Sequence, residues 1–409
     1  MGPEQVLAAI GATGVRARPG TGDDAVVGTV PAVVARPRDT PEVSALLGAA
    51  ARHGLRVAAA GNGTKRDWGA APTGCDLLVE TGELAGIEHA RGDLVVRTGA
   101  GAPMDGLRAL LGRAGQRLTA DPMVPGATVG GTVAAGVSGP LRMLHGPLRD
   151  LVIGMTVVRA DGVAASSGGV VVKNVAGFDL GKLHTGGWGT LGVITSVTFR
   201  LHPVPAAFRL VGARFPDPVA AAGPVGAVLA SQAVPAAVEL DWPPGGGPVR
   251  LFVLVEGAAE GVDARAGGIA ALLGARDVRD ALPDGWGTLP GEPECTVLKI
   301  AAPIRGLPVA LTALRAEAGT GCSFRGSAGA GVGYAALPVG TGADRVARVL
   351  ARTRDALPDG SVTVLRQSPD LRGLPLDRWG EVPGAELMRA VKDRFDPAHR
   401  LAPGRFLDH

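Results

Sequence analysis

The stretch Ala59-Ala60-Gly61-Asn62-Gly63-Thr64-Lys65 follows an apolar run, residues 55–60, that has the composition of a β-strand. Alternating glycines allow successive backbone N–H groups to point into one concavity, which is the geometry that holds a pyrophosphate. Thr64 adds a hydroxyl donor and Lys65 a positive charge, and each charge-assisted hydrogen bond would contribute roughly 1.5 to 3 kcal/mol. A plain turn after a strand is the alternative interpretation of this loop.

The residues before this loop predict the start of a β-α-β unit. Residues 33–35 are typical of a strand, and the apolar spacing of residues 43–53 predicts a helix. Thr40 is expected to cap this helix, with Pro41 at its first position and Gly54 just after its end. Strands are also expected over residues 77–80, 94–98, 151–159 and 192–201, a hairpin turn at residues 161–162, and a helix over residues 104–114.

A second glycine-rich element runs from Pro125 to Thr132 and continues to Ser138-Gly139-Pro140. So many small residues around a threonine indicate that a flat or extended group approaches the backbone closely. A tight structural turn is the alternative, but a turn does not need glycines at positions 126, 130, 131, 136 and 139 together.

A third glycine-rich stretch, Gly187-Trp188-Gly189-Thr190-Leu191-Gly192, matches the dinucleotide-binding pattern G-x-G-x-x-G. That pattern must follow a strand and open a helix, whereas this stretch opens the β-branched run 193–199. A Walker A loop is also missing, because Gly181-Lys182 is followed by leucine and lacks the earlier glycine. The sequence therefore disfavours an NAD enzyme or an NTPase.

Pro203 and Pro205 mark the expected domain boundary, since two prolines in three residues stop both helix and sheet. The chain is expected to divide into residues 1–205, 206–378 and 379–409. In the second part, strands are predicted over residues 238–241, 250–255, 333–338 and 362–366, helices over residues 262–273 and 343–356, and a glycine-rich loop over residues 319–333. A short amphipathic helix is predicted over residues 385–395.

The formal net charge is only +3, and 36 of the 41 basic residues are dispersed arginines, so the sequence lacks the basic patch of a nucleic-acid-binding protein. No run reaches the roughly 18 apolar residues of a membrane span, and the N-terminus does not resemble a signal peptide. We therefore expect a cytoplasmic protein without a transmembrane segment.

The sequence predicts no metal site. The seven histidines lack metal-ligand spacing, and Cys75, Cys295 and Cys322 stand alone, too few for an iron-sulfur cluster or a disulfide framework.

Four motifs together resemble a known family. The set A-G-N-G-T-K (60–65), A-T-V-G-G-T-V-A (127–134), V-V-K-N-V-A-G-F-D-L-G-K-L (171–183) and G-T-L-G-V-I-T (189–195) is similar to the FAD-binding domain of the vanillyl-alcohol oxidase superfamily. Within it, residues 115–122, 138–154 and 173–180 and A-P-G-R-F (402–406) resemble the smaller FAD-binding subunit of bacterial glycolate oxidase.

The resemblance implies an α+β fold, with a two-subdomain PCMH-type FAD-binding domain (1–205), an α+β cap for substrate or a partner (206–378), and a C-terminal helix and tail returning to the first domain (379–409). It also implies which residues bind FAD: Gly61, Asn62, Gly63, Thr64, Lys65, Pro122, Thr128, Val129, Gly130, Gly131, Ala135, Ser138, Gly139, Gly189, Gly192, Val193 and Ile194.

Departures from the family pattern refine these expectations. Asn62 stands where covalently flavinylated relatives carry histidine, which implies non-covalent FAD. Phe178 and His145 stand where the family commonly has tyrosine. His145 could donate a proton or be structural, and Asp179 could cap the next turn or touch the flavin. The motif H-x-G-D-G-N-x-H of the catalytic 2-hydroxy-acid dehydrogenases is absent, and no catalytic residue is assigned.

The function implied is an FAD-binding subunit of a glycolate (2-hydroxy-acid) oxidase that relays electrons or supports a larger catalytic flavoprotein subunit, beside an iron-sulfur subunit. Contact with the inner face of a membrane would then come through these partners. A free-standing FAD-dependent oxidoreductase for another alcohol or hydroxy acid is one alternative, with Arg305, Arg325 or Arg366 as candidates to anchor a carboxylate. A flavin-free structural subunit is the other.

Overall fold

The computed structural model describes residues 1–121, 123–169 and 179–405. These residues form two compact units: residues 1–137, 147–204 and 383–409 make the first, and residues 138–146 and 205–382 the second. Each unit is described by itself. Both contain helices and sheets, and the α+β class predicted from the sequence is confirmed.

The first unit begins with a four-stranded sheet in the order β1 (Ala17–Pro19), β2 (Val33–Ala35), β4 (Leu77–Glu80) and β3 (Val57–Ala60). The pairs β2–β4 and β3–β4 are parallel, as a β-α-β unit requires. Helices α1 (Pro3–Ile10) and α2 (Thr40–Arg52) pack on it, and the buried core includes Leu46, Leu47 and Leu77.

Helix α2 begins differently from the prediction. Its N-cap is Asp39, whose carboxylate accepts a hydrogen bond from the Glu42 amide at 2.8 Å, so Thr40 as N-cap was wrong. Thr40 is the first helical residue, and its hydroxyl donates to Thr195 Oγ1 at 2.9 Å. Aspartate competes well for the cap position. Gly54 follows the C-cap with a φ of +62°, as predicted.

A five-stranded sheet completes the first unit, in the order β5 (Ile87–Ala90), β6 (Val95–Gly99), β10 (Val193–Arg200), β8 (Val152–Val158) and β9 (Ala164–Gly168). All four strand pairs are antiparallel. The helices of this part are α3 (Met104–Arg113), α4 (Val129–Ala135), α6 (Leu148–Leu151) and α7 (Leu180–His184), and β7 (Gln116–Arg117) pairs with β11 (His202–Pro203).

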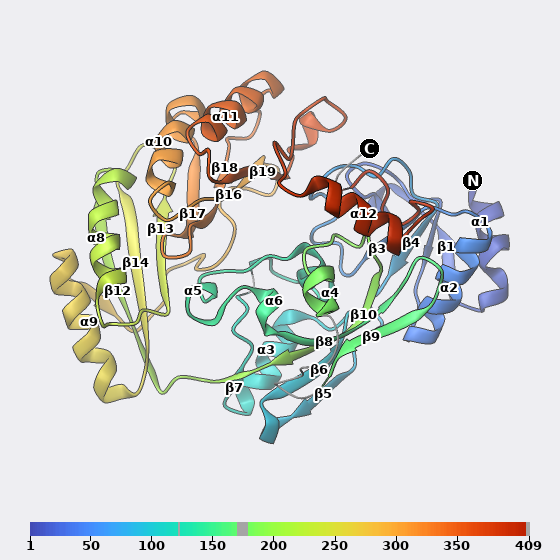
Figure 1. Ribbon diagram of the computed structural model, residues 1–409, viewed down its shortest axis with the longest axis horizontal. Coiled ribbons are helices and arrows are strands. Elements are labelled where there is room, and N and C mark those ends of the chain that lie inside the picture. The colour runs from blue at the N-terminus through green and yellow to red at the C-terminus, as the bar shows by residue number, and fades with distance from the viewer. Residues whose placement is uncertain (122, 170–178, 406–409) are drawn as a thin grey trace. The chain divides into compact units, whose positions relative to one another are not determined.

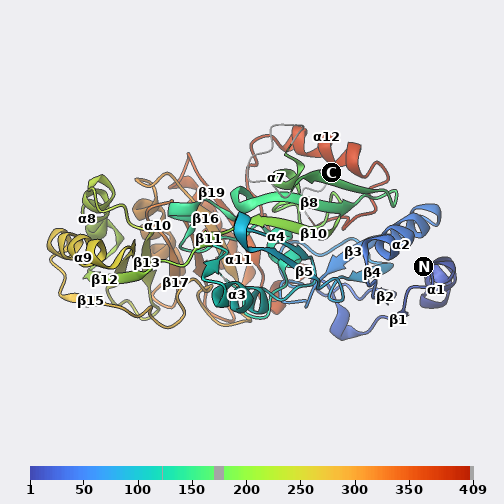
Figure 2. The same ribbon diagram turned by 90° about the horizontal axis from the view of Figure 1, so that it is seen from below.

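The C-terminal segment adds helix α12 (Ala385–Phe395) to this unit (Figure 2). After α12 the chain forms a parallel bridge between Leu401 and Val57, in which the Val57 amide donates to Arg400 O at 2.8 Å and the Ala402 amide to Val57 O at 2.7 Å. Arg400 Nη2 donates to Ala160 O at 2.7 Å. These bonds bring Arg405 next to the loop after β3.

The second unit is built on one antiparallel sheet of eight strands (Figure 1). Their order is β15 (Asp277–Arg279), β12 (Ala207–Phe215), β14 (Val249–Gly257), β13 (Ala237–Trp242), β17 (Ser323–Ser327), β18 (Val332–Ala336), β16 (Val297–Ala301) and β19 (Ser361–Arg366). Its helices are α8 (Pro218–Ala230), α9 (Ala259–Leu273), α10 (Leu307–Ala318), α11 (Ala343–Asp355) and the short α5 (Arg142–His145). The 3₁₀ turns of the two units are η1 (Gly11–Thr13), η2 (Gly22–Asp24), η3 (Arg91–Asp93) and η4 (Pro369–Leu371).

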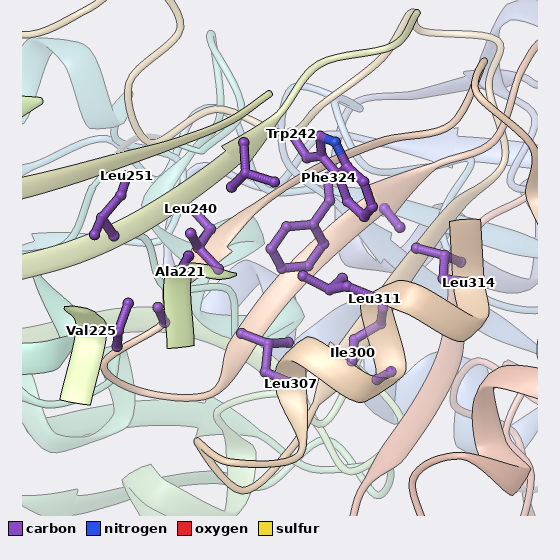
Figure 3. Close-up of a cluster of buried hydrophobic side chains, with 14 of the residues drawn as sticks. Ala221, Val225, Leu240, Trp242, Leu251, Ile300, Leu307, Leu311, Leu314 and Phe324 are labelled. Carbon is purple, nitrogen blue, oxygen red and sulfur yellow. The ribbon is translucent and has the colours of Figure 1, made fainter. Parts of the chain in front are cut away.

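Helices α8 to α11 cover one face of this sheet. Leu240 and Phe324 from the strands pack against Val225 of α8 and Leu311 and Leu314 of α10 (Figure 3). Alternate residues of each strand therefore point to the helices, and the residues between them point to the opposite face.

The glycine-rich loop predicted over residues 319–333 was wrong, because it contains β17 and its turn into β18. Gly326 pairs with Gly333 across the two strands, and a Cβ on Gly326 would lie 2.2 Å from the Gly333 Cα. A Cβ on Gly333 would lie 2.2 Å from Phe324 Cζ. The glycines allow close packing of strands here rather than a loop.

Candidate cofactor-binding site

A pocket in the first unit opens beside the loop that follows β3. Its lining comes mainly from three separate parts of the chain: the end of β3 with its loop, helix α4 with the residue before it, and the C-terminal segment. Val26 and Trp188 add to it from two other segments. The residues that line it are Val26, Ala58, Ala59, Ala60, Gly61, Asn62, Gly63, Thr64, Lys65, Arg66, Thr128, Gly131, Ala134, Ala135, Trp188, Ala402 and Arg405.

The two glycine-rich elements meet at this pocket. Asn62 Nδ2 donates to the carbonyl oxygen of Gly126 at 3.1 Å. A Cβ on Gly61 would lie 2.1 Å from Thr128 Oγ1, and Gly63 has a φ of +76°, which favours glycine. The loop can lie this close to the start of α4 only with glycine at position 61.

Helix α4 carries two neighbouring glycines with different surroundings. Gly130 faces the protein interior, because its Cβ would lie 2.7 Å from the Ala100 Cβ, and its amide donates to Ala100 O at 2.7 Å. Gly131 lines the pocket, and its amide donates to Thr128 Oγ1 at 3.2 Å. Gly130 thus allows α4 to pack, while Gly131 leaves room in the pocket.

Three cations border the pocket. Lys65 is half-buried, and its Nζ donates to Thr64 Oγ1 at 3.3 Å. Arg405 is only 7% exposed, and its Nη2 donates to Trp68 O at 2.9 Å. Within the described part of the chain, Nη1 of Arg405 and Nη1 of Arg66 are buried without a hydrogen-bond partner, and no carboxylate forms an ion pair with these three residues.

Burial of these cations changes their electrostatics. Burial lowers the pKa of Lys65 to about 8 and the pKa of Arg405 to about 10. Asp67 supplies some opposite charge to Arg405, whereas no carboxylate of the described residues acts on Lys65. A buried cation with little counter-charge is unfavourable, so both shifts indicate that the pocket is suited to an anion.

These residues fit the diphosphate of FAD. Unpaired guanidinium donors bind phosphate oxygens in planar pairs, a lysine adds a point charge, and a glycine loop allows the backbone to approach. Arg66 and Arg405 were not predicted as site residues, although Arg66 directly follows the predicted loop and Arg405 lies within the quoted motif A-P-G-R-F.

Eight of the predicted FAD-binding residues line this one pocket: Gly61, Asn62, Gly63, Thr64, Lys65, Thr128, Gly131 and Ala135. Others do not line it: Val129 and Gly130 are buried in α4, Gly189 and Gly192 lie between α7 and β10, and Val193 and Ile194 are buried in β10. Ser138 and Gly139 belong to the second unit. Pro122 lies outside the described residues.

The structure also places two further residues singled out in the sequence. Asp179 caps α7, accepting a hydrogen bond from the Lys182 amide at 3.2 Å. His145 ends α5 in the second unit. Phe178 lies outside the described residues, as does most of the motif around it.

The described residues show neither a metal-binding cluster nor a membrane-spanning helix. They contain no group of three or more His, Cys, Asp or Glu side chains that could hold a metal ion. None of their helices is both long and apolar enough to cross a membrane.

Comparison with known proteins identifies a domain around this pocket. Residues 31–167 match the family model described as FAD binding domain. The chain is 31% identical to glycolate oxidase subunit GlcD of Bacillus subtilis over 220 residues, which is 53% of this chain and 46% of the relative. It is 33% identical to D-lactate dehydrogenase of Archaeoglobus fulgidus over 45% of this chain and 42% of the relative.

A shorter stretch is more similar to a third relative. Over 117 residues the chain is 41% identical to glycolate oxidase subunit GlcE of Escherichia coli, covering 28% of this chain and 33% of the relative. The chain thus spans between a third and about half the length of these relatives.

A solved structure shows the same fold over nearly the whole chain. Xylooligosaccharide oxidase from Myceliophthora thermophila aligns with a TM-score of 0.71, covering 98% of this chain and 99% of that one at 15% identity. The domain match, the relatives and the fold agree: the chain contains an FAD binding domain, with FAD as its cofactor, and it is similar to proteins of the vanillyl-alcohol oxidase superfamily.

Proposed function

We propose that the chain is an FAD-dependent oxidoreductase subunit of the glycolate oxidase type, which holds FAD non-covalently and works beside a larger catalytic flavoprotein subunit and an iron-sulfur subunit. The observation that carries the FAD site is the set of three cations around the Gly61–Gly63 loop, which form no ion pair among the described residues: Lys65, Arg66 and Arg405. The similarity to two glycolate oxidase subunits supports the substrate class and the complex.

Bound FAD supplies the acceptor for a hydride or for electrons, and the protein contributes binding and orientation. Lys65, Arg66 and Arg405 would neutralise the diphosphate, and Gly61 and Gly131 would leave room for it. The predicted residues of β10 and of the segment before it, Gly189, Gly192, Val193 and Ile194, would contribute backbone on the adenine side. Pro122, Ser138 and Gly139 would border the diphosphate and the flavin.

Asn62 supports non-covalent binding. Its amide is already used to hold Gly126, and an amide is not a nucleophile that could form a bond to the flavin. The loop position where relatives with covalent flavin carry histidine therefore has a structural role here.

The choice between a relay subunit and a free-standing enzyme rests on the substrate machinery. Oxidation at an α-carbon needs a base and a cation or metal for the carboxylate, and residues 203–398 contain no histidine. We therefore propose that the isolated chain relays electrons or completes the complex, and a free-standing oxidoreductase is the alternative.

Anaerobic addition of glycolate or D-lactate to the purified chain tests this choice through the flavin absorbance. We expect little bleaching by the chain alone and full activity only after co-expression with its partners. Rapid bleaching, with steady turnover using an artificial electron acceptor, would establish the free-standing enzyme instead.

A further inference from the structure

The face of the eight-stranded sheet opposite helices α8 to α11 carries a row of polar side chains. Strand pairing places Asp241, Arg325, Tyr334, Lys299 and Thr363 side by side across β13, β17, β18, β16 and β19. Each lies between residues that point to the helices, so all five side chains share this face.

At one end of the row, the polar side chains have hydrogen-bond and ion-pair partners. Arg250 Nη2 and Asp241 Oδ2 form an ion pair at 2.6 Å, and Arg325 Nε lies 3.8 Å from Asp241 Oδ1. Arg325 Nη1 also donates to Gly285 O and to Thr288 Oγ1, each at 2.8 Å. Arg366 on β19 similarly donates to Glu292 O at 2.6 Å and to Cys295 O at 3.1 Å. Neither arginine is left to anchor a carboxylate.

At the other end of the row, two side chains have no hydrogen-bond or ion-pair partner among the described residues. Tyr334 is 3% exposed, and its hydroxyl has no hydrogen-bond partner among the residues that the structure describes. Directly opposite it on β16, the half-buried Lys299 makes no hydrogen bond or ion pair within the described chain. A buried hydroxyl and an adjacent ammonium without acceptors are unfavourable unless a ligand supplies one.

A third donor comes from residues 138–146, which pack on this same face. Leu141 contacts the apolar cluster of Leu210, Ala237 and Phe252 on the side away from the helices. The charge of the next residue, Arg142, acts on both Lys299 and Tyr334. Burial and the Arg142 charge lower the pKa of Lys299, and burial raises the pKa of Tyr334 to about 12, so the phenol remains a donor.

We propose that Lys299, Arg142 and Tyr334 form a binding site for a small organic carboxylate in the second unit. The two cations balance its charge, and the Tyr334 hydroxyl donates to one of its oxygens. The buried Glu239, on the same face of β13, raises the pKa of Tyr334. Its negative charge also disfavours a ligand with more than one negative charge. A carboxylate is therefore favoured over a phosphate dianion. The inference rests on the second unit alone and does not depend on the FAD site.

Isothermal titration calorimetry of the full FAD-loaded protein with sodium acetate tests the site. Acetate carries a single negative charge and has no hydroxyl at its α-carbon to be oxidised, so it leaves the flavin unchanged. We expect binding at one site per chain. Lys299→Met and Arg142→Gln should each weaken it at least tenfold, and Tyr334→Phe about fivefold. The matched control is Arg214→Gln, an exposed arginine on the same sheet face about 24 Å from Lys299, given strand spacings of about 4.8 Å. It should bind acetate like the wild type.

Thermal melting without ligand separates a binding role from a structural one. Lys299→Met should melt no lower than the wild type, since it removes a charge that has no partner. A site that does not bind acetate, a site that prefers inorganic phosphate, or acetate affinity unchanged in both Lys299→Met and Tyr334→Phe would overturn the proposal. Failure of Lys299→Met to fold would overturn it as well, because Lys299 would then be structural.

Discussion

The side-chain amide of Asn62 donates a hydrogen bond to the carbonyl oxygen of Gly126 at 3.1 Å, joining two glycine-rich segments that lie 64 residues apart. This bond closes one edge of the pocket in the first unit, and Arg405 approaches it from the C-terminal segment. The candidate FAD site is therefore assembled mainly from three distant parts of the chain.

Gly61→Val should abolish FAD retention. A Cβ at residue 61 would lie 2.1 Å from Thr128 Oγ1, so the loop would have to move away from α4. The flavin content of the purified variant, measured from its absorbance, checks this. Gly112→Ala, where an added Cβ meets nothing within 4 Å, is the control and should keep its FAD. Stoichiometric FAD in Gly61→Val would show that the cofactor lies elsewhere.

Lys65→Met and Arg405→Leu should each weaken FAD binding at least tenfold, which corresponds to about 1.4 kcal/mol. Lys65→Met removes a buried cation on which no carboxylate of the described residues acts, so its apo-protein should melt at the same temperature or higher. Titration of apo-protein with FAD gives the affinity. Arg108→Met, which removes an exposed charge on α3, should change neither quantity. Equal loss of affinity in this control would mean that net charge alone drives binding.

FAD affinity should fall as pH rises through about 8. Burial places the pKa of Lys65 at about 8 in the folded apo-protein, below its usual value, so the ammonium that would bind phosphate is lost above that pH. The free energy of unfolding of the apo-protein changes in the opposite direction. Between pH 8 and about 10.4 the unfolded chain binds more protons at Lys65 than the folded chain does, so the contribution of this residue to apo-protein stability rises with pH. FAD titrations from pH 6.5 to 9.5 test the effect, which Lys65→Arg should remove. A flat profile in the wild type would place the Lys65 amine away from the phosphates.

Lys392→Met should destabilise the first unit by about 3 to 5 kcal/mol, the cost of leaving a buried charge unpaired. Its Nζ donates to Asp396 Oδ2 at 2.6 Å, Thr190 O at 2.7 Å and Leu401 O at 2.9 Å, and Asp396 is 0% exposed. Urea denaturation measures the loss. The double variant Lys392→Met/Asp396→Leu should recover part of it, because it removes the unpaired carboxylate; no recovery would assign the loss to the two carbonyl contacts.

The sequence predicted the parts of the structure that depend on neighbouring residues. Three of these parts are strand β3 before the Gly61–Lys65 loop, the end of helix α2 at Gly54, and helix α12. The structure has each of them at or near the predicted bounds. Asp39 was missed as a cap because Thr40-Pro41 gave an equally good local signal. The glycines of residues 319–333 suit a turn, so the sequence predicted a loop where strand β17 lies. Only the pairing of Gly326 with Gly333 shows why two adjacent strands need glycine at these positions.

Distant contacts account for what the sequence did not predict in the site. Arg405 lies 340 positions after Lys65, and only the bridge between Leu401 and Val57 brings it to the pocket. Gly130 shows the reverse case, since a position predicted to face FAD packs against Ala100. Likewise, only the three-dimensional packing shows that Tyr334 and Lys299 lie side by side without partners among the described residues.

Acid precipitation of the purified protein tests the central claim most directly. The protein should be yellow as isolated or after incubation with FAD, and acid should release the flavin into the supernatant, because Asn62 offers no covalent anchor. The Lys65→Met/Arg405→Leu double variant should stay colourless under the same treatment. A wild-type protein that takes up no FAD, or flavin that remains in the precipitated pellet, would contradict the account.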